Sequence, residues 1–150
     1  MAITSAICSS FKQELLQGKH NFSSSSGDSF KIALFDSSAT LGASTTDYST
    51  SEEITNTSGT AYTAGGKALT NTGVGLTSTT AFTDFSDVSW TTASFTANGA
   101  LIYNTTTGTS TSTTDAVCAI AFGSDKTENY GTFTIQFPAK DSSNAIIRLA

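Results

Sequence analysis

Short segments in which apolar and polar residues alternate recur along this chain, and they constrain its fold more than any other feature. In residues 131–138, GTFTIQFP, the apolar Phe133, Ile135 and Phe137 alternate with threonine and glutamine. A period of two places the apolar side chains on one face of a β-strand. Comparable segments are separated by turns rich in Gly, Ser, Thr and Asp, so we predict a mainly β fold: a β-sandwich or jelly-roll-like domain of about eight strands.

Three segments have the pattern of strands inside a sheet. Residues 29–36 (SFKIALFD) and 115–123 (DAVCAIAFG) are apolar on both faces, as expected where both faces of the strand are buried. Residues 94–104 (SFTANGALIYN) form the clearest central strand, with Gly99 as a bulge or a point of close backbone approach. Residues 37–50 are rich in small polar residues and predict a loop or a weakly paired edge.

The remaining segments are shorter or more polar. The aromatic cluster of residues 81–90, AFTDFSDVSW, is predicted to cover one end of the core rather than to form an exposed sticky patch. Residues 124–131 (SDKTENYG) read as a turn, and residues 105–114 (TTTGTSTSTT) as an exposed hairpin loop. Further strands are predicted at residues 52–57, 67–72, 74–80 and 144–150.

The N-terminal segment, residues 2–22, carries the one convincing helix signal. Apolar residues recur every four positions in a single stripe, which predicts an amphipathic helix of about three to four turns. Thr4 or Ser5 can cap its start, and Gly18 is placed to end it at C′. We therefore expect one domain over residues 1–150, with an N-terminal helical segment at 1–22 and a β-domain at 28–150.

The apolar stripe of this helix must be covered, and two alternatives remain open. The helix packs on its own sheet, or it docks on a partner protein. In the second case the candidate protein–protein contact residues are Ile7, Phe11, Leu15 and Leu16.

Composition limits the class of partner. The net charge is −5 and the seven basic residues are scattered, which disfavours nucleic-acid binding because phosphate contacts need clustered Lys and Arg. No apolar run is long enough for a membrane span, and the N-terminus lacks the pattern of a secretion signal. We expect a protein made in a cytoplasm, with neither nucleic acid nor membrane as a partner.

No pattern in the sequence indicates catalysis, a cofactor or a metal. The single histidine, His20, lies among polar residues, and no GxSxG motif presents a serine nucleophile. The carboxylate pairs Asp84 with Asp87 and Asp125 with Glu128 lack EF-hand spacing and read as turn residues. We predict a protein that is not an enzyme, without cofactor, catalytic residues or metal ligands.

Two smaller alternatives stay open. Cys8 and Cys118 are read as reduced, buried thiols, while a bridge from the helix to the sheet is the alternative. A carbohydrate-binding face would need exposed aromatic rings, for which the chain supplies Tyr48, Tyr62, Trp90 and Tyr130.

Several sequence blocks carry a resemblance that goes beyond these patterns. They are AITSAICSSFKQELLQGKHNF, FKIALFDSSATLGASTTDYS, AYTAGGKALT, NGALIYN, FGSDKT, GTFTIQFP and AIIRL, and together they cover nearly the whole chain in order. In these blocks the chain resembles a family of small structural proteins of tailed bacteriophages and prophages.

The resemblance implies a virion component and carries no active-site residues. The expected function is a non-enzymatic structural protein, foremost a capsid decoration or cement protein that stabilises the head shell, with the virion as its location. Its expected partners are the major capsid protein or other virion proteins, and further copies of itself in a homo-oligomer. The alternatives are a tail, neck or fibre-adaptor component, or a carbohydrate-binding β-sandwich module.

Overall fold

The computed structural model describes residues 2–55, 59–106 and 112–150. Within these ranges the chain is mainly β, with two antiparallel sheets and one short helix, so the predicted fold class is confirmed. Its elements in chain order are β1 (Ala6–Ile7), α1 (Ser9–Leu16), β2 (Phe30–Phe35), β3 (Lys67–Ala68), β4 (Asn71–Thr77), β5 (Thr80–Phe85), β6 (Val88–Asn104), β7 (Ala116–Ile135) and β8 (Ile147–Leu149).

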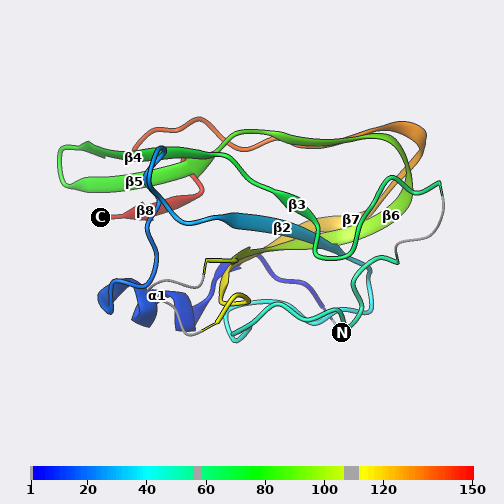
Figure 1. Cartoon of the computed structure of the whole chain (residues 1–150), viewed down its shortest axis with the longest axis horizontal. Coiled ribbons are helices and arrows are strands. Elements are labelled where there is room, and N and C mark those ends of the chain that lie inside the picture. Colours follow the sequence, from blue (N-terminus) through cyan, green and yellow to red (C-terminus); the bar gives the residue numbers. More distant parts are fainter. Residues whose placement is uncertain (1, 56–58, 107–111) are drawn as a thin grey trace.

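The two sheets lie one above the other. The larger has the order β1-β7-β6-β2-β3 and the smaller the order β4-β5-β8. Figure 1 shows β4, β5 and β8 on one side of β2, and α1 on the other side. The long hairpin of β6 and β7 curves around one end of the molecule and returns, so it runs along both layers (Figure 1). The core between and beside these layers forms one continuous hydrophobic cluster.

The inner strands lie where the alternation predicts them. All of β2 except Lys31 is buried, and it pairs with β6 on one side and β3 on the other. Gly99 of β6 lies at a register shift against β7. A Cβ there would come within 2.7 Å of the carbonyl oxygen of Ile120, which confirms the predicted close backbone approach.

The predicted turn at residues 124–131 is wrong. These residues belong to β7, a strand that continues from Ala116 to Ile135. Their polar composition resembles a turn, but residues 126–131 pair with residues 93–97 of β6. Ladder hydrogen bonds to a neighbouring strand therefore override the local preference. The structure describes only the ends of the predicted loop 105–114, because residues 107–111 lie outside the described ranges.

The strand predicted at residues 52–57 is also not found in its described part. Glu53 makes a single bridge to Phe35, and residues 56–57 lie outside the described ranges. The segment 67–72 is divided between β3 and the start of β4. The aromatic cluster of residues 81–90 is mainly core, as predicted, since Phe85 and Trp90 are both 3% exposed.

The N-terminal helix is shorter than predicted. Residues before it run along the sheet instead: Ile3 bridges to Leu41, and β1 pairs with β7. The helix begins after Cys8, which makes no side-chain capping bond, so neither Thr4 nor Ser5 is its cap.

The end of the helix was predicted correctly. Gly18 has a φ of 72°, and its N–H donates to Leu15 O at 3.1 Å while Lys19 N–H donates to Glu14 O at 3.0 Å. These two bonds form a Schellman motif with glycine at C′.

Candidate functional site

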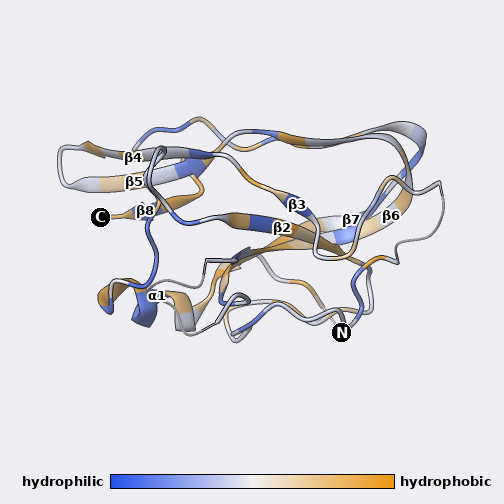
Figure 2. Ribbon diagram, viewed as in Figure 1, coloured by the Kyte–Doolittle hydropathy of each residue, from blue (hydrophilic) through white to orange (hydrophobic). Residues whose placement is uncertain are grey.

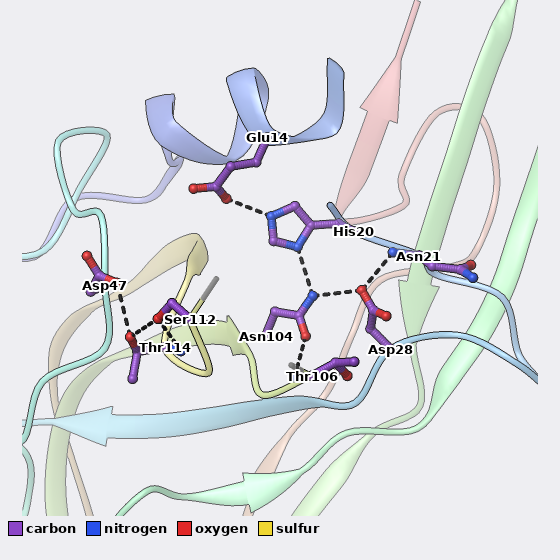
Figure 3. Close-up of polar contacts among 9 residues, drawn as sticks. All are labelled: Glu14, His20, Asn21, Asp28, Asp47, Asn104, Thr106, Ser112 and Thr114. Carbon is purple, nitrogen blue, oxygen red and sulfur yellow. Dashed lines mark hydrogen bonds and ion pairs between the residues drawn. The ribbon is translucent and has the colours of Figure 1, made fainter. Parts of the chain in front are cut away.

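A buried polar network joins the end of α1 to the centre of the larger sheet (Figure 3). His20 Nε2 lies 2.7 Å from Glu14 Oε2 of the helix, and His20 Nδ1 lies 3.0 Å from Asn104 Nδ2 at the end of β6. Asn104 Nδ2 also donates to Asp28 Oδ2 at 2.8 Å, and the N–H of Asn21 donates to the same oxygen at 2.9 Å. Residues of the N-terminal segment 14–28 therefore meet the end of β6, which is distant in the sequence.

The hydrogen bonds define the tautomer of His20. The Asn104 Oδ1 atom accepts from the N–H of Thr106 at 2.9 Å, which fixes the amide orientation. The Nδ2 group of Asn104 then gives one hydrogen to Asp28 and the other to His20 Nδ1. His20 Nδ1 is consequently an acceptor, and Nε2–H donates to Glu14.

This arrangement does not support catalysis by His20. Both ring nitrogens have partners, and the His20 side chain is fully buried. A general base needs a nitrogen that can reach the proton it removes. The network instead ties the helix and the segment after it to β6, since a satisfied buried network holds its elements in one arrangement.

Glu53 is a buried carboxylate whose hydrogen bonds hold the loop between β2 and β3 in one arrangement. Glu53 accepts hydrogen bonds from Tyr48 Oη at 2.7 Å, Tyr62 Oη at 2.6 Å and the N–H of Gly65 at 2.7 Å. Burial, followed by the hydrogen bond to Glu53, raises the pKa of both tyrosines above the ordinary value. Burial raises the pKa of Tyr103, which stacks on Tyr48, to about 12. Sequence reasoning missed this cluster, because its members come from separate turns.

The prediction that the carboxylate pairs are turn residues is wrong for Asp84, which lies in β5, and for Asp125 and Glu128, which lie in β7. Asp84 and Asp87 hold backbone that is distant in the sequence. Asp84 is 1% exposed and accepts from the N–H groups of Phe85 and Ile146 at 2.9 and 3.2 Å. Asp87 accepts from the N–H of Phe137 at 2.8 Å. Burial raises the pKa of Asp84 above its ordinary value. Within residues 2–55, 59–106 and 112–150, no three His, Cys, Asp or Glu side chains gather to hold a metal ion.

The two cysteines are free and buried, as the reduced alternative predicts. Burial raises the pKa of Cys8 to about 11 and also raises that of Cys118. A thiol held in its protonated form is a poor nucleophile. Neither cysteine therefore has the environment of a reactive residue.

The aromatic rings offered for carbohydrate binding are mostly in the core. Trp90 is 3% exposed and packs against Phe95 and Phe133, and Tyr62 is 1% exposed. Stacking on a sugar needs an open ring face. Tyr130, at 72% exposure, is the one large exposed ring among the described residues.

The predicted contact residues of the helix separate into two groups. Phe11 is 1% exposed, and its ring centroid lies 4.8 Å from that of His20 and 5.9 Å from that of Phe22. Ile7 and Leu15 are partly buried against the same core. Self-packing is therefore the outcome for Phe11, which no partner can reach in the folded chain. Leu16 is 92% exposed, and its contact with a partner stays a prediction.

Leu16 is one of four exposed large aliphatic side chains in the described part of the chain, which come from α1, β4 and β8. We name this set the apolar end surface and define it by its four side chains: Leu16 at 92% exposure, Leu149 at 56%, Val74 at 62% and Leu76 at 71%. Figure 2 shows apolar colouring at the outer end of α1 and on the strands of the smaller sheet above it. Between them lies a groove of about 280 Å³, lined by Leu15, His20, Asn21, Phe22, Val74, Ala81, Phe82, Thr83, Ile147 and Leu149.

The strand register explains why Val74, Leu76 and Leu149 lie on one face of the smaller sheet. Val74 of β4 pairs with Thr83 of β5, which pairs with Ile147 of β8. Leu76 pairs with Ala81, which pairs with Leu149, in the next row of the same face. Paired residues of antiparallel strands project to one side. The alternation of Val74 and Leu76 is the sequence signal that could have found this face.

No protein-family model, curated protein or solved structure matches this chain. No helix in the described ranges has the length and apolar character needed to cross a membrane.

Proposed function

We propose that this protein is a non-enzymatic structural component of a bacteriophage particle, and that it acts as a capsid decoration or cement protein on the head shell. The resemblance to phage structural proteins in the sequence blocks supports the class. The observation that carries the proposal is the apolar end surface, with its groove between α1 and the smaller sheet.

The interior of the protein supports a binding role over a chemical one. In the described part of the chain, Ser10 Oγ is the only buried side-chain oxygen or nitrogen without a hydrogen-bond partner. The buried carboxylates and His20 have internal partners. Buried polar groups that are satisfied in this way stabilise a fold. Any contact with other molecules therefore has to be made by side chains on the protein surface.

The apolar end surface can contribute usefully to assembly. Burying a leucine or valine side chain contributes about 1.5 to 3 kcal/mol, so four side chains of this exposure offer about 4 to 8 kcal/mol before the costs of association. Leu149 lines the groove, and Leu16 follows the groove-lining Leu15 on α1. A cement protein that bound the shell through them would favour the assembled shell by mass action.

The test uses phage shells that lack this protein, to which the purified chain is added and cosedimented. We expect the chain to bind, and we expect Leu16→Ser and Leu149→Ser each to weaken binding by about tenfold, the effect of about 1.4 kcal/mol. Tyr130→Ser is the matched control, because the 72% exposure of Tyr130 lies between those of Leu149 and Leu16 but the residue is on β7. Binding that is absent, or unchanged in both leucine variants, would contradict the proposal.

The alternative location in the tail or neck predicts a different result from the same material. The chain would then bind purified tails or neck complexes and would not cosediment with shells.

A further inference from the structure

The free strand edges of this fold are not equally protected. In the larger sheet, the edge strands β1 and β3 have two residues each, and β3 begins with Lys67. In the smaller sheet, the edge strand β8 has three residues with Arg148 at its centre. Short edges and edge charges are devices that prevent unwanted strand pairing.

The long part of β7 beyond β1 is protected in another way. It carries Asp125, Lys126 and Glu128, and its pairing with β6 is interrupted by register shifts. Charges and bulges along an edge both hinder a further strand from adding.

The outer part of β4, residues 74–77, has none of these protections. The strand is seven residues long, and the whole segment 68–83 contains no charged residue. Ser24 and Lys140 lie beside Gly73, and Lys140 Nζ donates to Thr72 O, so the start of the strand is covered. Residues 74–77 remain as an open, uncharged edge.

The hairpin geometry shows which backbone groups this edge presents. Thr77 pairs with Thr80 across a two-residue turn, and Ser78 in that turn has a φ of 54°. The closing pair of such a hairpin is hydrogen-bonded, and bonded and non-bonded pairs then alternate along the strands. Val74 and Leu76 therefore fall at non-bonded pairs, so their N–H and C=O groups point away from β5, to the open side.

We propose that this edge binds a second copy of the same chain, by antiparallel pairing of β4 with β4 of the partner about a two-fold axis at Gly75. Val74 then lies opposite Leu76 of the other copy, and the two pairs exchange about four backbone hydrogen bonds. The apolar end surfaces of the two copies meet along the axis and form one larger apolar face.

Self-complementarity is the reason for choosing a second copy as the occupant, and the lack of charge on the strand permits it. Each copy carries a net charge of −5, so two copies approach most favourably through a surface without charge. A two-fold axis places the same uncharged strand on both sides. It also gives each outward donor an acceptor, because a C2 interface is self-complementary.

The dimer deepens the proposed function, because it gives the homo-oligomer a defined surface. Its test needs only the purified protein, so failure of the dimer and failure of shell binding are separate results. Sedimentation equilibrium should show a reversible species of twice the 15.5 kDa chain mass. The double variant Val74→Lys/Leu76→Lys should weaken dimerisation by at least about tenfold, since it places like charges opposite each other and removes apolar burial. Tyr130→Lys on the protected β7 edge is the control and should dimerise normally.

Hydrogen exchange of the wild type provides a second measurement that does not depend on how the variants fold. The amides of Val74 and Leu76 should exchange more slowly as protein concentration rises, while the amide of Gly75, which faces β5, should be insensitive. A wild type that remains monomeric would overturn the proposal. So would a dimer that the lysine pair leaves unchanged, or concentration-dependent protection confined to another strand.

Discussion

Truncation of Phe11 tests whether the N-terminal helix belongs to the core of this chain. Phe11 is 1% exposed and contacts the rings of His20 and Phe22. Replacing a buried phenylalanine by alanine removes its burial and leaves a cavity, which costs about 3 to 5 kcal/mol. In a domain of this length each kcal/mol lowers the Tm by about 2 to 4 °C. Phe11→Ala should therefore lower the Tm by about 6 to 20 °C.

The measurements are thermal unfolding for the Tm and urea unfolding for the free energy of unfolding, both followed by the fluorescence of Trp90, the single tryptophan of the chain. Leu16→Ala is the matched control on the same helix. Leu16 is 92% exposed, so this change should alter the free energy of unfolding by less than about 0.5 kcal/mol. A loss below about 1 kcal/mol for Phe11→Ala, or an equal loss for both variants, would refute the assignment of the helix to the core.

Three further predictions concern backbone, thiols and carboxylates. In urea unfolding, Gly66→Ala should destabilise the fold by at least about 2 kcal/mol more than Gly18→Ala. Both glycines have positive φ, but only at Gly66 would a Cβ overlap a backbone carbonyl of β2. Equal losses of stability in the two variants would contradict this prediction. Cys8 and Cys118 are buried free thiols, so an aromatic disulfide reagent should modify neither in the native state and both in urea, whereas no reaction in urea would indicate a bridge. Burial raises the pKa of Asp84, so its contribution to stability is present in acid and is lost as pH rises through the folded pKa. The unfolding free energy of the wild type should therefore fall relative to that of Asp84→Asn between acid and neutral pH, and a relative rise would count against the burial effect.

The sequence predicts those elements whose local pattern and pairing agree. β2 and the end of β7 alternate or are continuously apolar, and each forms a strand. Gly18 ends the helix because no other residue adopts its φ as readily. The turn prediction for residues 124–131 is wrong because their polar side chains favour a turn, while the curved β6–β7 hairpin supplies a partner strand that local sequence does not reveal.

The polar networks, and the meeting of α1 with the smaller sheet, lie beyond what local pattern can predict. Asn104 meets His20 across 84 residues and Asp28 across 76, so their contact depends on the completed fold. Leu15 and Leu149 come from opposite ends of the chain and line one groove only after α1 and β8 are placed. The helix stripe indicated the right region, but tertiary packing decided that Phe11 faces inward and Leu16 outward.

The central claim is our proposal that this chain sits on a phage head shell, and a fitted cryo-electron microscopy map of the corresponding phage particle tests it most directly. The account predicts density for the β-sandwich on the head shell, with Leu16 and Leu149 against the major capsid protein. A map that places the chain on the tail or neck, or a particle without it, would contradict the capsid assignment.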